Sequence, residues 1–121
     1  MTRSMVRFVL AAVAAGTVVL ASGSAFAAGD AAKGKVGFMK YGCWQCHGTQ
    51  GQGSAITSAG KVLAPDPLPY DSFSAFVRST NRAMPPYTEA VLPNDDLADI
   101  HAYLSSIPKP KDYKSIPLLS Q

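Results

Sequence analysis

Residues that bind metal ions are scarce in this chain, whose 121 residues include only two cysteines and two histidines. Cys43, Cys46 and His47 stand together, and His101 lies far along the chain. A structural zinc site needs four ligands, commonly including two histidines three to five residues apart. The chain has no such histidine pair, so its composition disfavours a zinc-binding domain.

Strand-like segments, a second long apolar run and basic patches are also missing. No run of β-branched residues follows Cys46, whereas thioredoxin-like redox proteins place a C-x-x-C pair in a β-α-β unit. Beyond the first 27 residues, no apolar run approaches the roughly 20 residues that span a bilayer. These absences favour a small helical domain and give no indication of nucleic acid binding.

The first 27 residues have the pattern of a secretory signal. Arg3 and Arg7 supply a positive start, residues 8–21 form an apolar run, and Ala25-Phe26-Ala27 is a small-x-small cleavage pattern. Because the apolar run is too short to span a bilayer, cleavage after Ala27 is favoured over an uncleaved anchor. We therefore expect a signal peptide at 1–27, a folded domain at 28–108, an extended C-terminal tail at 109–121, and a mature protein in the periplasm.

The exported part of the chain is nearly neutral. Two of the eleven basic residues lie in the signal, so nine basic and eight acidic residues remain, a formal charge of +1. The basic character of the whole sequence therefore says little about partners.

The five residues Cys43-Trp44-Gln45-Cys46-His47 form the C-x-x-C-H motif of c-type haem attachment. Each thiol can add across one haem vinyl group, and the spacing brings both sulfurs to one edge of the macrocycle. His47 would then lie beneath the iron as the proximal axial ligand. A haem-free thiol oxidoreductase or a metal site remains an alternative at this point.

Three helices are expected in the folded domain. Asp30 caps a first helix that runs to about Tyr41, and a glycine-rich loop follows His47. Asp71 or Ser72 caps a second helix to about Thr80, and a third begins with Asn94 as its cap and ends before Pro108. The residues expected to face inward on the second and third helices are Phe73, Phe76, Val77, Leu97, Ile100, Tyr103, Leu104 and Ile107.

Three features in this order resemble class I c-type cytochromes: Gly34 and Phe38 before the haem motif, Met84-Pro85-Pro86-Tyr87 after a helix, and a last helix that reads Asp-Leu-Ala-Asp-Ile-x-Ala-Tyr-Leu at 96–104. The resemblance implies an all-α small cytochrome c fold, with three to four helices around one covalently bound haem c. It implies that the first and last helices cross closely at Gly34, with Phe38 against Tyr103. It also makes Met84 the distal iron ligand.

The chain departs from the family pattern beside the proximal histidine. Where the family often has Gly-Pro-x-Leu, this chain has Gly60-Lys61-Val62-Leu63. In the family, the proline carbonyl accepts a hydrogen bond from the proximal histidine. Since Lys61 retains a backbone carbonyl, we expect it to accept the same bond from His47. The stretch from His47 to Met84 is short, so part of the haem edge should be open.

The choice of distal ligand decides between function classes. Met39 lies on the wrong side of the first helix, and His101 lies at the margin of the last helix's apolar stripe. We therefore expect Cys43 and Cys46 to hold the haem and His47 and Met84 to bind its iron, which gives an electron carrier and not an enzyme. Its partners would be a periplasmic dehydrogenase, as partner or as the complex that contains it, and a terminal oxidase or another cytochrome. With Met84 unbound, the alternative is a gas-binding or peroxide-reducing protein.

Overall fold

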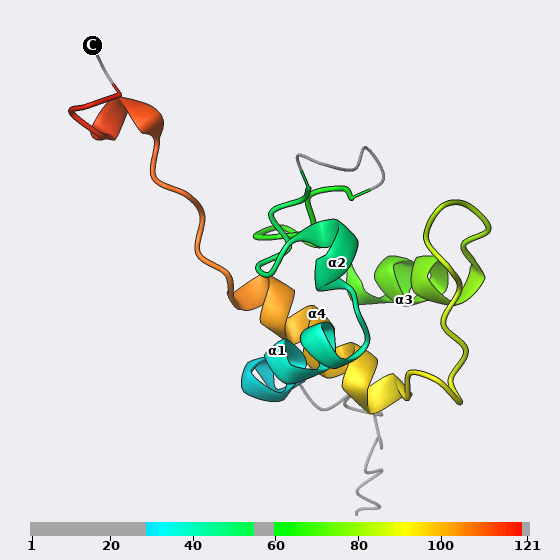
Figure 1. Ribbon diagram of the computed structural model, residues 1–121. Coiled ribbons are helices and arrows are strands. Elements are labelled where there is room, and N and C mark those ends of the chain that lie inside the picture. Colours follow the sequence, from blue (N-terminus) through cyan, green and yellow to red (C-terminus); the bar gives the residue numbers. More distant parts are fainter. Residues whose placement is uncertain (1–28, 55–59, 120–121) are drawn as a thin grey trace, which may run out of the picture.

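The computed structural model describes residues 29–54 and 60–119 and shows only helices among them (Figure 1). The predicted signal segment at 1–27 lies outside these residues. The elements are α1 (Ala31–Lys40), α2 (Trp44–His47), α3 (Tyr70–Ser79), α4 (Asn94–Ser106) and a short 3-10 helix, η1 (Tyr113–Ser115). The prediction of an all-α fold with three to four helices is confirmed.

Helix α1 crosses α4, and its own sequence determines how closely. Asp30 caps α1 as predicted, because its carboxylate accepts hydrogen bonds from the backbone N–H groups of Ala32 (2.8 Å) and Lys33 (3.1 Å). At the crossing, a Cβ atom added to Gly34 would overlap the carbonyl group of Asp99. Only glycine permits this backbone approach.

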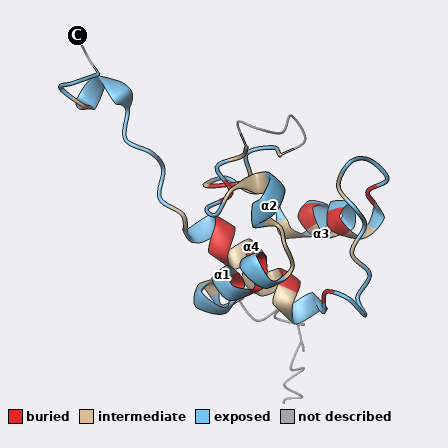
Figure 2. Cartoon of the chain, viewed as in Figure 1, coloured by how far each residue is buried: buried red, intermediate tan, exposed pale blue. Residues whose placement is uncertain are grey.

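The core lies along the inner face of α4, where Figure 2 shows buried residues on α1, α3 and α4. The rings of Phe38 and Tyr103 pack with their centroids 5.7 Å apart, as the resemblance implied. The buried apolar residues are Phe38, Ala64, Phe73, Val77, Leu92, Leu97, Ile100, Tyr103 and Leu104.

Helices α3 and α4 begin differently from the prediction. The carbonyl of Pro69 accepts from the N–H of Phe73 (2.9 Å), and that of Pro93 accepts from Leu97 (3.0 Å). Each proline therefore occupies the N-cap position, without a side-chain cap. Asn94 is the first residue of α4 and not its cap, because its side chain is used in tertiary hydrogen bonds.

Two side chains of α3 also differ from the prediction. Phe76 was expected to be buried, yet it is 50% exposed and lines a large cavity. Arg78 was expected to face solvent, but it is half-buried and donates hydrogen bonds to other segments. Both differences arise on the side of α3 that meets the loop following it.

The C-terminal tail leaves the domain after α4 and extends away from it (Figure 1). It is extended as predicted except for η1, where the carboxylate of Asp112 accepts from the N–H of Lys114 (3.0 Å). An exposed ion pair between Lys109 and Asp66 (3.2 Å) ties its start to the domain. Such pairs contribute little stability, about 0 to 1 kcal/mol.

Candidate functional site

A cavity of about 620 Å³ lies between α2, α3 and the loop that follows α3. Its size is in the range of cofactor pockets, which is roughly 300 to 1,000 Å³. The core side chains Phe38, Leu97, Ile100 and Leu104 form part of its wall. The residues that bring chemistry to it are Cys43, Cys46, His47, Lys61, Arg82, Met84 and Tyr87.

The walls of this cavity include apolar side chains that the protein leaves uncovered. Val62, Leu68 and Phe76 are 67%, 56% and 50% exposed, and all three line the cavity. Small soluble domains rarely leave a concave surface of this kind uncovered unless it binds something. The cavity therefore fits a large, flat, mainly apolar group such as a haem.

The two cysteines and the histidine are brought together by one turn of helix. The N–H of His47 donates to the carbonyl of Cys43 (3.0 Å), so Cys43 directly precedes α2, and Cys46 and His47 end it. Residues three apart on a helix share a face, which places both sulfurs toward the same cavity. All three predicted residues line it.

Burial raises the pKa of the Cys43 thiol to about 11. The side chain is therefore protonated near neutral pH. A redox-active dithiol needs the opposite, a thiol whose pKa is lowered so that the thiolate forms. The environment of Cys43 thus favours a group held in an apolar cavity over a reactive thiol.

The imidazole of His47 is oriented by a hydrogen bond to the backbone. Its Nδ1 atom lies 2.8 Å from the carbonyl oxygen of Lys61, as expected from the sequence. A carbonyl can only accept, so Nδ1 carries the proton and Nε2 keeps its lone pair for a metal. Gly60 permits the arrangement, since a Cβ atom there would overlap the carbonyl of Cys46.

Met84 reaches the same cavity from the loop between α3 and α4. It is half-buried and lines the cavity together with Arg82 and Tyr87. The hydroxyl of Tyr87 donates to the carbonyl of Tyr41 (2.8 Å), which joins this loop to the end of α1. The structure therefore brings all four predicted site residues to one cavity.

The competing distal ligands do not line the cavity. The Nε2 atom of His101 lies 2.8 Å from the carbonyl oxygen of Leu68. The ring of His101 also packs against those of Tyr70 and Phe73, with centroids 5.5 and 5.3 Å apart. Met39 is 39% exposed on α1. Neither side chain is available to the cavity in this arrangement.

Sequence reasoning gave no site role to two residues of the cavity. Tyr87 was noted only as part of the Met-Pro-Pro-Tyr motif, and Arg82 only as a surface charge. Burial raises the pKa of Tyr87, whose hydroxyl remains a hydrogen-bond donor. Their position within three residues of Met84 was the available signal, because residues that flank a ligand in a stiff loop share its environment.

Other kinds of site find no support within residues 29–54 and 60–119. No three His, Cys, Asp or Glu side chains there are grouped so that they could hold a metal ion. In the same part of the chain, no helix has the length and apolar character needed to span a membrane.

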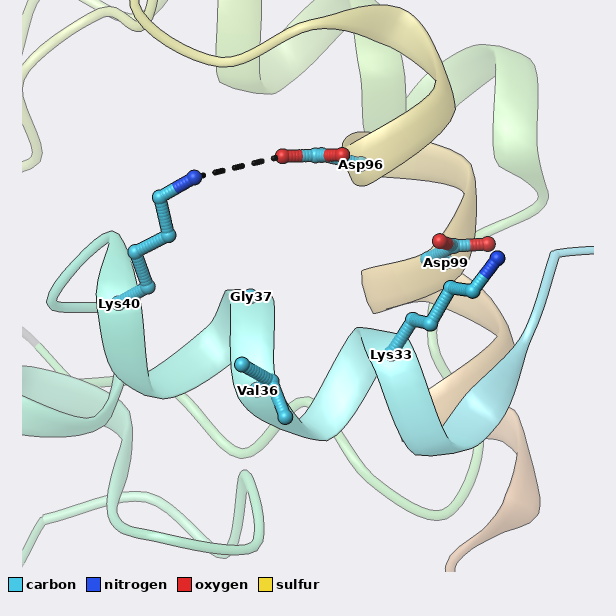
Figure 3. Close-up of a pocket in the computed structure, with 6 residues that line it drawn as sticks. All are labelled: Lys33, Val36, Gly37, Lys40, Asp96 and Asp99. Atoms are coloured by element: carbon cyan, nitrogen blue, oxygen red, sulfur yellow. Dashed lines mark ion pairs between the residues drawn. The ribbon is translucent and has the colours of Figure 1, made fainter.

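A second, shallower depression of about 280 Å³ lies at the seam where α1 crosses α4 (Figure 3). Lys40 and Asp96 form an exposed ion pair there, 3.9 Å apart. Asp96 also accepts from the hydroxyl of Tyr41, and Asp99 accepts from the backbone N–H of Asp30 (2.6 Å). Because these carboxylates already have donors, the depression is part of the helix contact.

The comparison with protein families gives one match. The family model described as cytochrome C oxidase, cbb3-type, subunit III matches residues 29–104, which include α1 to α3 and most of α4. Neither a search of curated proteins nor a search of solved structures gave a match.

Proposed function

Because the chain belongs to the family described as cytochrome C oxidase, cbb3-type, subunit III, which makes it a class I c-type cytochrome with covalently bound haem c, we propose that it carries single electrons in the periplasm. An electron-transfer role follows from the family. The periplasmic location is supported by the signal pattern at residues 1–27.

Four residues of the cavity have defined roles in this proposal. Cys43 and Cys46 hold the haem through thioether bonds, and His47 is the proximal ligand through Nε2. Met84 is the distal ligand. The observation that carries the proposal is that all four line one cavity, while Lys61 fixes the tautomer of His47.

This ligand set suits electron transfer and not catalysis on a substrate. The haem, when bound, supplies an iron that alternates between the ferrous and ferric states. His47 and Met84 occupy both axial positions, so they exclude substrates and small ligands from the metal. A thioether ligand stabilises ferrous iron and raises the reduction potential relative to two histidines.

The partners of such a carrier are other redox proteins. We propose a periplasmic dehydrogenase as donor and a terminal oxidase or another cytochrome as acceptor, and the oxidase named in the family description supports the second. Trp44, between the two cysteines, is 39% exposed and does not line the cavity. It is thus available to a docking partner close to the attached haem edge.

The alternative function, a gas-binding or peroxide-reducing haem protein, has one observation in its favour. Around Met84, residues Arg82, Ala83, Pro85 and Pro86 are all exposed, so the distal ligand sits in a solvent-facing loop. A loop that moved away would open the distal side of the iron.

Replacing Met84 by alanine tests the proposal against this alternative. The wild-type ferrous protein should not bind carbon monoxide, whereas Met84→Ala should bind it and have a lower reduction potential. His101→Ala is the matched control and should behave as the wild type. Carbon monoxide binding by the wild type, with no change in potential in Met84→Ala, would support the open-site alternative.

A further inference from the structure

The loop that carries Met84 is held most firmly at Tyr87. The N–H of Tyr87 donates to the carbonyl of Val77 (3.0 Å), and its hydroxyl donates to the carbonyl of Tyr41 (2.8 Å). Its own carbonyl accepts from Nη1 of Arg78 (2.9 Å). Every polar group of Tyr87 is therefore paired, and the partners come from both α3 and the end of α1.

The position of Tyr87 is passed on to Met84 through two stiff residues. Only Pro85 and Pro86 separate them, and a proline ring fixes its own φ near −65°. Each proline also restricts the residue before it to extended conformations, which constrains Met84 itself. On the other side of the loop, the Thr80 hydroxyl lies 3.5 Å from the Met84 carbonyl, a long and weak contact.

Arg78 holds this arrangement without touching the cavity. While Nη1 donates to Tyr87, Nη2 donates to the side-chain oxygen of Asn94 (2.7 Å), whose amide donates to Glu89 (2.8 Å). Arg78 does not line the cavity and is half-buried in the last turn of α3. Its guanidinium thus joins α3, the loop and the start of α4 by charge-assisted hydrogen bonds, which are stronger than neutral ones.

We infer that Arg78 is a positioning residue for the distal ligand: by fixing the carbonyl of Tyr87, it holds the thioether of Met84 over the iron. This inference rests on the proposed function, in which Met84 binds the iron. Without the guanidinium, the Tyr87 carbonyl loses its donor and the loop gains freedom to move. Met84 then leaves the iron more often, and an added ligand competes more successfully.

Titration of the ferric holoprotein with imidazole measures this effect, because imidazole must displace Met84 to bind. We expect the Kd for imidazole to fall about tenfold in Arg78→Leu, which corresponds to about 1.4 kcal/mol. Asn94→Ala leaves the bond to Tyr87 in place but removes its support, so we expect a fall of about threefold. Lys35→Met is the matched control: it removes a positive charge from the exposed side of α1 and should leave the Kd unchanged.

A double-variant cycle shows whether Arg78 acts through Met84. In the Met84→Ala background the distal ligand is gone, so adding Arg78→Leu should leave the imidazole Kd where Met84→Ala alone has set it. A merely structural role would lower the melting temperature of the methionine-ligated and the imidazole-saturated protein equally and leave the wild-type-background Kd unchanged. That result would overturn the inference.

The two ways of failing are distinguishable. If Met84→Ala binds imidazole no more tightly than the wild type, Met84 is not the ligand and the proposed function and the inference fall together. If Met84→Ala binds imidazole more tightly while Arg78→Leu does not, only the inference fails. Should Arg78→Leu give no folded holoprotein, Arg78→Lys and Asn94→Ala decide, since a lysine lacks the fork that reaches both partners. An unchanged Kd in both would overturn the inference.

Discussion

Gly34 provides a test of the helix crossing on which the haem cavity is built. In Gly34→Ala, the added Cβ would lie 2.8 Å from the Cβ of Tyr103 and would overlap the Asp99 carbonyl. Both obstacles are rigid, because one is backbone and the other is the root of a buried ring. The helices must therefore separate, and overpacking of this kind costs about 1 to 3 kcal/mol.

The opposing effect is the helix propensity of alanine, which exceeds that of glycine by up to about 1 kcal/mol. Gly37→Ala is a matched control because it makes the same change one turn along α1. Its Cβ would meet only the outer side-chain atoms of Ile100, at 3.2 and 3.4 Å, which can shift slightly. We therefore expect Gly37→Ala to be neutral or stabilising, and Gly34→Ala to be destabilising by about 1 to 2 kcal/mol.

Thermal unfolding of the holoprotein, followed by far-ultraviolet circular dichroism, measures the difference. For a domain of this size, a loss of 1 kcal/mol lowers the melting temperature by about 4 to 8 °C. Gly34→Leu should be more severe than Gly34→Ala. If Gly34→Ala melts at or above the temperature of the wild type, the close crossing is not what requires glycine, and the argument is refuted.

Two further predictions concern the haem and its partner. After denaturation and acid-organic extraction the protein should retain its haem, and Cys43→Ala with Cys46→Ala should release it, because only the thioethers resist unfolding; haem that extracts freely from the wild type would exclude covalent attachment. Two haem propionates bring the exported chain from +1 to about −1, so steering by charge should be weak. Since transient redox contacts bury less than roughly 1,200 Å², Trp44→Ala should slow electron transfer from the physiological donor without changing the reduction potential, and added salt should have little effect; a steep salt dependence with no effect of Trp44→Ala would indicate docking through charges such as Arg82.

Local patterns in the sequence predicted much of the fold and of the candidate site. The cap at Asp30, the apolar stripe of α4 and the spacing from Cys43 to His47 depend on neighbours within one or two helical turns, and each appears as expected. The bond from His47 to Lys61 was predictable too, because any residue at that position supplies a carbonyl.

Features that depend on distant partners were not predictable from local patterns. Asn94 has the composition of a cap, but Arg78 and Glu89 engage its side chain across the loop. Phe76 fits the inward face of a helix, yet that face borders a cavity and not the core. The sequence shows neither the loop geometry nor the cavity, since both arise when α3 and α4 pack.

The most direct test of a one-electron carrier with a closed iron is a potentiometric titration of the wild-type protein with and without carbon monoxide. We expect a single wave of about 59 mV per tenfold change in the ratio of oxidised to reduced protein, as for one electron. With His47 and Met84 on the iron, the midpoint should be the same in both titrations. Carbon monoxide binds only ferrous iron, so an open site would raise the midpoint by mass action. A midpoint that rises under carbon monoxide would contradict the account.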